Sequence, residues 1–108
     1  MTKLSMTPVM RVQLKLALAA SSHDRVTLRS VETEAMQLRL SGAEIDAAKR
    51  GASFNALIDV AVKFALAVYF NDTVGVAATK KRLLSFQLAA IVPEIHVLVR
   101  ETPRPALP

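Results

Sequence analysis

The segment from Phe54 to Phe70 constrains the fold of this chain more than any other part. Its residues are apolar around most of the circumference of a helix, and only Asp59 and Lys63 interrupt them with charge. Such a helix has to be covered on nearly every side, by other helices or by a second subunit. The spacing of Asp59 and Lys63 is that of an ion pair along one helix face; a functional pair buried in the core is the alternative.

Start and stop signals define further helices before this segment. Thr7 and Pro8 combine a capping hydroxyl with a proline at the first helical position. Residues 41–44, Ser-Gly-Ala-Glu, have the form of a capping box, and Gly51 lies where a left-handed C-terminal cap belongs. We therefore expect a helix from residue 8 and a short helix between the capping box and Gly51.

For two other helices, the sequence offers two candidate capping residues each. Either Ser22 or Asp24 can cap a second helix, which carries one apolar stripe at helical spacing. Either Ser53 or Asn55 can open the apolar central helix. Each of these four side chains has an oxygen that can accept a hydrogen bond from the first turn of the helix.

The C-terminal part predicts one or two more helices. Gly75 marks a turn, and residues 76–84 are expected to form a helix or a helical turn. Ser85 can then cap a last helix. Pro93 lies within that helix, so we expect a kink there, or a break with a restart at Glu94.

These signals predict an all-α protein, a compact bundle of five to six helices. No segment shows the alternation of a β-strand, and 108 residues correspond to a single domain, 1–108. The last residues, 101–108, are rich in proline and are expected to form an extended C-terminal tail.

The apolar content predicts association between copies of the chain. Hydrophobic residues make up 52% of the sequence but aromatic ones only 5%, so the core must be largely aliphatic. A small domain this apolar is expected to cover its surplus in a homo-oligomer, with Phe64 and Val68 at the interface. The alternative is that segments before Met10 and after Ser85 cover the central helix within one chain.

Residue counts exclude several kinds of site. The chain has no cysteine, which rules out disulfides, thiolate zinc sites and thiol redox chemistry. Its two histidines, His23 and His96, lie far apart without metal-type spacing, and its three glycines are scattered. We therefore expect no metal, no phosphate-binding loop and no cofactor.

The net charge of +5 permits an acidic partner such as nucleic acid. Only residues 80–82, Lys-Lys-Arg, form a basic cluster, and no aromatic residues are interleaved with them, so a solvated helix face is the favoured interpretation. No segment is long and apolar enough to predict a membrane span. We expect a soluble, cytoplasmic protein.

The stretch from Leu40 to Gly51 resembles the Gly-Leu-Ser-x-x-Glu-Ile region of the alkylhydroperoxidase D-like/carboxymuconolactone decarboxylase family. In that family the region follows the reactive helix and precedes a long alanine-rich helix, the place that residues 54–70 take here. Residues 101–108 resemble the family's Thr-x-x-Asp-Phe-Pro ending. The likeness covers residues 7–108 in element order, and it implies the family's helical fold with subunits associated through their helices.

The family's reactive signature is Cys-x-x-Cys followed four residues later by His, with a relay Glu one helix earlier. Counting back from Leu40 places Asp24 and Thr27 at the cysteine positions, Val31 at the histidine position and Val12 near the glutamate position. None of the four residue types is present, and valine supplies no base to activate a nucleophile. Decarboxylase-type members work without the cysteine pair, but no matching base motif is found either. The resemblance therefore implies a scaffold whose thiol peroxidase chemistry is absent.

His23 and Asp24, beside two serines, are the only weak candidates for catalytic residues. Adjacent residues rarely point at one another, so a polar turn between helices explains this cluster better. We favour a non-catalytic interaction or regulatory protein with a protein partner or a second copy. The alternatives are a non-thiol enzyme of the same family, acting through His23, and a small basic DNA-associated regulator.

Overall fold

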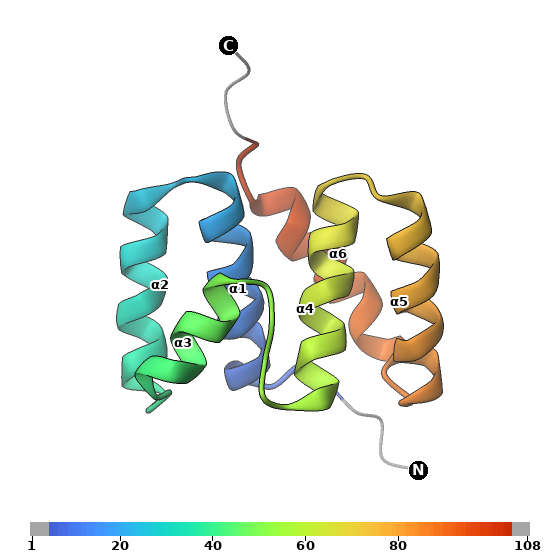
Figure 1. Ribbon diagram of the computed structural model, residues 1–108, viewed down its shortest axis with the longest axis horizontal. Helices are drawn as coiled ribbons and strands as arrows, with labels where there is room; N and C mark the ends of the chain where they lie inside the picture. Colours follow the sequence, from blue (N-terminus) through green and yellow to red (C-terminus); the bar gives the residue numbers. More distant parts are fainter. Residues whose placement is uncertain (1–4, 105–108) are drawn as a thin grey trace.

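The computed structural model describes residues 5–104, which form six α-helices and one short 3₁₀ helix and contain no strand (Figure 1). This confirms the predicted all-helical bundle. The helices in chain order are α1 (Pro8–Ser22), α2 (Arg25–Gln37), α3 (Gly42–Lys49), α4 (Ala56–Tyr69), α5 (Thr73–Ser85), η1 (Ala89–Ile91) and α6 (Val92–Glu101).

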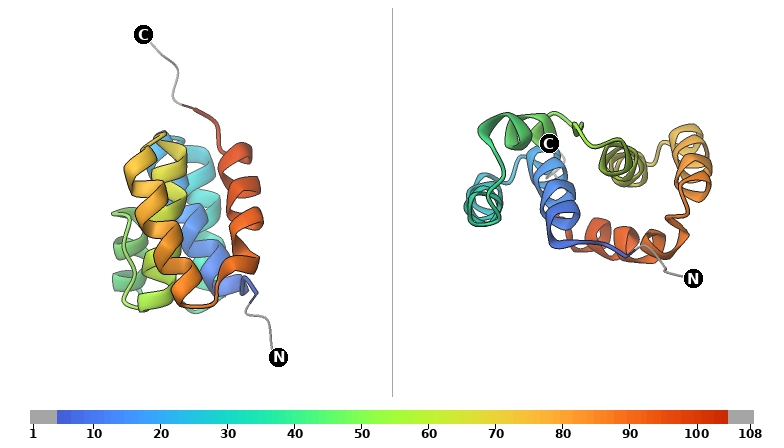
Figure 2. Two further views of the ribbon diagram at one scale, coloured as in Figure 1. Left: turned by 90° about the vertical axis from the view of Figure 1, so that its right-hand side faces the viewer. Right: turned by 90° about the horizontal axis from the view of Figure 1, so that it is seen from below.

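Helices α1 and α4 pack against each other at the centre of a flat molecule of 38 × 36 × 20 Å (Figures 1 and 2). On one side α2 and α3 pack on α1, and on the other side α5 and α6 pack on α4. Seen from below, α3 and α6 lie on opposite faces of the row formed by α2, α1, α4 and α5 (Figure 2). The α1–α4 contact therefore joins two small helical groups into one compact bundle.

The local start and stop signals hold in the structure. The Thr7 hydroxyl accepts a hydrogen bond from the Met10 amide at 3.1 Å, which caps α1. Ser41 and Glu44 form both hydrogen bonds of a capping box at the start of α3. Gly51 follows α3 with a φ of 84°, the left-handed conformation that favours glycine.

The structure decides between the two capping candidates at the starts of α2 and α4, and in each case the second residue is the cap. Asp24 caps α2 by accepting a hydrogen bond from the Thr27 amide, and Asn55 caps α4 by accepting from the amides of Leu57 and Ile58. Ser22 instead belongs to the last turn of α1, where its hydroxyl donates to a backbone carbonyl.

The C-terminal boundaries differ from those predicted. Gly75 does not mark a turn; it lies in the first turn of α5, where its amide donates to the capping carboxylate of Asp72. Ser85 ends α5 rather than capping the next helix, because its hydroxyl donates back to the Arg82 carbonyl. The break comes before Pro93, which lies in the first turn of α6, where a missing amide hydrogen costs no helical hydrogen bond.

Helix α4 is covered within the single chain by α1, α5 and α6. Phe64, at its centre, is 0% exposed and has no surface to offer a second subunit, which differs from the expectation that it lies at an interface. Val68 is half-buried and keeps part of its surface. The residues before Met10 and after Ser85 contribute to this cover, as the single-chain alternative predicted.

The predicted tail begins one residue later than expected, because Glu101 still belongs to α6. Thr102 is extended, with a φ of −85° and a ψ of 122°, and the described chain continues without helix to Arg104. The remainder of the predicted tail, residues 105–108, lies outside the described residues. Among the helices of residues 5–104, none has the length and apolar character needed to cross a bilayer.

Candidate functional site

A cavity of about 230 Å³ opens between α1, α2 and the end of α6. Two other hollows beside α5 are more open to solvent. Its lining side chains come from α1 (Lys15, Ala19, Ser22), from α2 (Thr27, Val31) and from the end of α6 with the following segment (Leu98, Glu101, Thr102, Pro103).

Two of the four positions implied by the family resemblance line this cavity; Val12, near the glutamate position, lies in the core instead. Thr27, at the second cysteine position, and Val31, at the histidine position, both face it from α2. Asp24, at the first cysteine position, does not line it. Its carboxylate accepts hydrogen bonds from the Thr27 hydroxyl at 2.6 Å and the Thr27 amide at 3.1 Å. These two bonds, led by that from the hydroxyl, lower the pKa of Asp24, so the carboxylate acts as an ionised helix cap.

His23 is not brought into the cavity. It is the C-terminal cap residue of α1 in a left-handed conformation, with a φ of 59°, and it is exposed. Within residues 5–104, no hydrogen bond joins His23 to Asp24. The predicted weak catalytic pair is therefore explained by the turn between α1 and α2.

The other singled-out polar residues have ordinary structural surroundings. His96 is half-buried and packs edge-on against the Phe64 ring, with 5.7 Å between centroids. In the described part of the chain, no three histidine, aspartate or glutamate residues gather where a metal ion could bind. The basic cluster, residues 80–82, lies exposed on α5.

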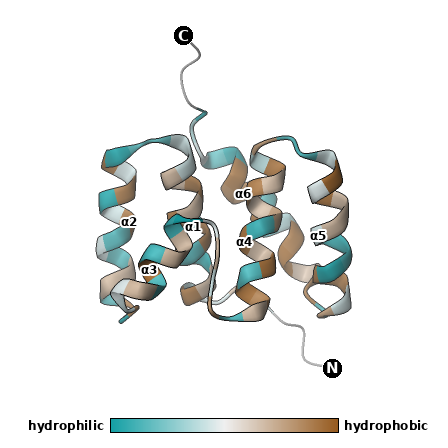
Figure 3. Cartoon of the chain, in the orientation of Figure 1, coloured by the Kyte–Doolittle hydropathy of each residue, from teal (hydrophilic) through white to brown (hydrophobic). Residues whose placement is uncertain are grey.

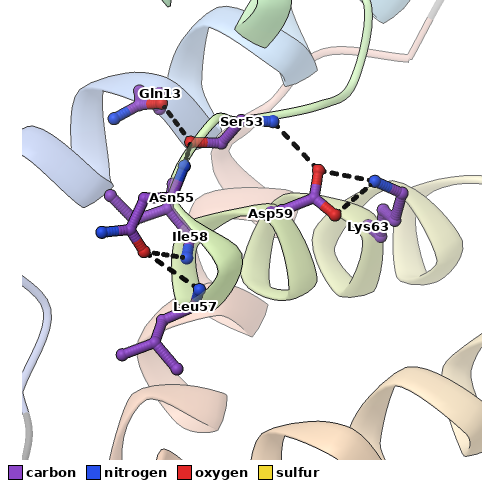
Figure 4. Close-up of polar contacts among 7 residues, drawn as sticks. All are labelled: Gln13, Ser53, Asn55, Leu57, Ile58, Asp59 and Lys63. Carbon is purple, nitrogen blue, oxygen red and sulfur yellow. Dashed lines mark hydrogen bonds and ion pairs between the residues drawn. The ribbon is translucent and has the colours of Figure 1, made fainter.

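The predicted ion pair along α4 is present and belongs to a larger polar network (Figure 4). Lys63 donates to both carboxylate oxygens of Asp59 at 2.6 Å. The Ser53 amide donates to the same carboxylate, and the Ser53 hydroxyl donates to the buried side chain of Gln13 on α1. Partial burial raises the pKa of Asp59, but the hydrogen bonds from Lys63 and Ser53 outweigh it and lower the pKa. The network ties the loop before α4 to α1, and periodicity gives no signal for a contact between residues so far apart.

A second set of contacts, missed by the sequence analysis, fixes the wall of the cavity at its C-terminal side. The Tyr69 hydroxyl donates to the carbonyl of Pro103 at 3.1 Å. The Arg104 guanidinium donates to the Tyr69 carbonyl and lies 4.5 Å from the centre of the Tyr69 ring. A tyrosine ring beneath a guanidinium is an attractive cation–π contact. The end of α4 thus holds the segment after α6 against the cavity.

Compared with known proteins, the chain matches no family model, no curated protein and no solved structure.

Proposed function

We propose that this chain is a non-catalytic helical interaction or regulatory protein, built on a scaffold of the alkylhydroperoxidase D-like/carboxymuconolactone decarboxylase kind. The observation that carries the proposal is the cavity beside Thr27 and Val31. In the resembled family these two positions hold reactive residues, and here they supply a hydroxyl and an aliphatic wall. A cavity kept at this place, without a nucleophile and its base, suits binding rather than turnover.

The hydrogen bonds between Thr27 and Asp24 support a cavity without a nucleophile. The Thr27 hydroxyl donates to the Asp24 carboxylate, but this carboxylate also accepts the Thr27 amide and serves as the cap of α2. A carboxylate with a lowered pKa is a weak base at neutral pH. The Thr27 oxygen therefore lacks a partner suited to activate it.

Exposed apolar side chains support a partner-binding role. Val26, Val74 and Phe54 are 82%, 78% and 73% exposed, although each is large and hydrophobic. They lie near the start of α2, near the start of α5 and in the loop before α4. Scattered exposed apolar residues are common on monomers. A chain that is 52% hydrophobic nevertheless favours a second copy as the partner, and we include a homo-oligomer in the proposal.

Two measurements test this proposal separately. Incubation with hydrogen peroxide or an organic hydroperoxide, with and without a dithiol reductant, should give no turnover above buffer. Turnover that is lost in the His23→Ala variant would show an enzyme and contradict the non-catalytic role. Light scattering at micromolar concentration should give a mass above that of one chain, 11.7 kDa. A mass equal to one chain would contradict the homo-oligomer and leave a different partner to be identified by cross-linking.

A further inference from the structure

The hydroxyl groups around the cavity present hydrogen-bond acceptors to a ligand. Ser22 donates its hydroxyl proton to the Ala19 carbonyl at 3.0 Å, and Thr102 donates to the Leu98 carbonyl at 2.8 Å. Thr27 donates to the Asp24 carboxylate at 2.6 Å. With each proton committed inside the chain, each hydroxyl keeps only oxygen lone pairs for a bound molecule.

The charged groups at and beside the cavity also favour a ligand that carries a positively charged hydrogen-bond donor. Lys15 lies within 2.9 Å of Glu34 on α2, so its positive charge is offset by a neighbouring carboxylate. Glu101 lines the cavity at the end of α6 and makes no ion pair with any residue of the described chain. The lining itself is neutral, with one positive charge on Lys15 and one negative charge on Glu101, and Glu34 beside Lys15 leaves one net negative charge, which is complementary to an ammonium group.

The remaining walls are apolar. Ala19, Val31 and Leu98 are buried side chains that face the cavity from three helices. A cavity of about 150 Å³ holds benzene, so 230 Å³ corresponds to a ligand of about nine non-hydrogen atoms. The wall formed by Pro103 is held in place by the Tyr69 hydroxyl, which gives the cavity a fixed side.

We propose that this cavity binds a small amine with an apolar body. The ammonium group donates to the hydroxyl oxygens of Ser22, Thr27 and Thr102 and is attracted by the Glu101 carboxylate. The apolar body packs against the three buried aliphatic side chains of the wall. This binding goes beyond the proposed interaction role and adds a small-molecule ligand to it. The net charge of +5 on the whole chain opposes long-range attraction of a cation, so recognition is local and the expected dissociation constant is about 0.1–1 mM.

Calorimetric titration with three probes of similar size tests the charge preference. 2-Phenylethylamine is the expected ligand, 2-phenylethanol is its neutral analogue and phenylacetate is its acidic analogue. We expect the amine to bind about fivefold or more tightly than the alcohol, and phenylacetate to bind most weakly. Equal affinity for the amine and phenylacetate, or no binding of the amine at 10 mM (roughly tenfold above the weakest expected constant), would overturn the proposal.

Two exposed glutamates on α6 give a matched pair of variants. Glu101→Gln removes the carboxylate at the cavity. It should weaken binding of the amine about fivefold and have little effect on binding of the alcohol. Glu94→Gln removes an exposed carboxylate from the first turn of the same helix, away from the cavity lining, and should leave both affinities unchanged. Equal weakening by the two variants would mean a general charge effect and would overturn the assigned site.

A third variant tests the location without relying on charge. Thr27 is exposed at the cavity, so Thr27→Trp should fold and fill the space, and it should abolish binding of both the amine and the alcohol. Its helix content is checked by circular dichroism. Unchanged amine binding to a folded Thr27→Trp would place the ligand elsewhere. None of these outcomes depends on the hydroperoxide assay or on the mass in solution, so this inference and the proposed function can fail independently.

Discussion

Helices α4 and α2, on opposite sides of the molecule, have similar lengths but bury very different numbers of residues. In α4, eight of its residues are buried, including the whole of Phe64, whereas in α2 only Val31 and Ala35 are buried. Hydrophilic residues cover much of α2 (Figure 3). The α4 side therefore carries the main core, and α2 is attached to α1 by a thin apolar strip next to the cavity.

Two separate apolar clusters reflect this difference. The large cluster joins α1, α4, α5 and α6, and the small one joins α1, α2 and α3. Helix α1 belongs to both, because different faces of it contribute Leu14 to the large cluster and Leu16 to the small one. The cavity lies where the two clusters meet, because its lining includes Val31 of the small cluster and Leu98 of the large one.

The largest expected effect is a difference in the free energy of unfolding between two alanine variants. Phe64→Ala empties a fully buried position of the large cluster and should cost about 3–5 kcal/mol. Val31→Ala removes two methyl groups from the small cluster and should cost about 1–2 kcal/mol. Urea unfolding followed by circular dichroism measures both losses. Equal losses would show that α2 is as firmly packed as α4.

Much of the fold follows from local chemistry in the sequence. The caps at Thr7, Ser41 and Gly51 were predictable because each depends on side chains within a few residues of the helix end. The roles predicted for Ser85 and Gly75 are wrong for a related reason, since both residues lie within α5. A hydroxyl can cap the start of a helix or bond back to a carbonyl at its end, and a glycine can enter a helix next to a strong cap at the preceding turn.

The candidate site was predictable only in part. The positions Thr27 and Val31 came from the resemblance, and the structure places both at one cavity. The resemblance at residues 101–108 did not place Glu101 at the cavity, and nothing in the sequence indicated the contact between Tyr69 and Pro103, because both depend on where α6 ends relative to α4. Long-range contacts of this kind are set by packing, which local sequence patterns do not contain.

An intermediate effect is expected from a pair of cysteines that tests the alignment at α2. In Asp24→Cys with Thr27→Cys, the two new thiols replace side chains whose oxygens lie 2.6 Å apart. Under oxidation this variant should close an intramolecular disulfide, although loss of the Asp24 cap should lower the stability of the fold. Thiol titration before and after oxidation measures closure.

The matched control replaces Asp24 and Val26 by cysteine, because their side chains point in different directions from the start of the helix. This control should keep both thiols free within the chain. If the double variant at positions 24 and 27 folds but its disulfide never closes, the geometry required by the family resemblance is contradicted.

The smallest expected effect compares one carboxylate from each side of the molecule in acid. The folded state lowers the pKa of Asp24 through its bonds to Thr27, and it lowers the pKa of Asp59 through Lys63 and Ser53 despite partial burial. A carboxyl whose pKa is lower in the folded than in the unfolded chain stabilises the fold above its ordinary value, 3.8 for aspartate. That stabilisation is lost as the pH falls from about 4 through the folded pKa, so the melting temperature should decrease over this range.

Asparagine variants separate the two contributions. Asn caps a helix about as well as Asp, so Asp24→Asn should change the melting temperature little at pH 7. Asp59→Asn removes the ion pair to Lys63 and weakens the acceptor for the Ser53 amide, and should cost about 1 kcal/mol at pH 7. This cost should shrink in acid, as the pH falls below the ordinary aspartate pKa of 3.8, because wild-type Asp59 then binds a proton and loses the same interactions. Melting curves of the wild type and the two variants, recorded at pH 7 and in acid, measure these differences. A larger loss for Asp24→Asn than for Asp59→Asn would show that the α2 side, and not the α4 side, depends more on its ionised carboxylate.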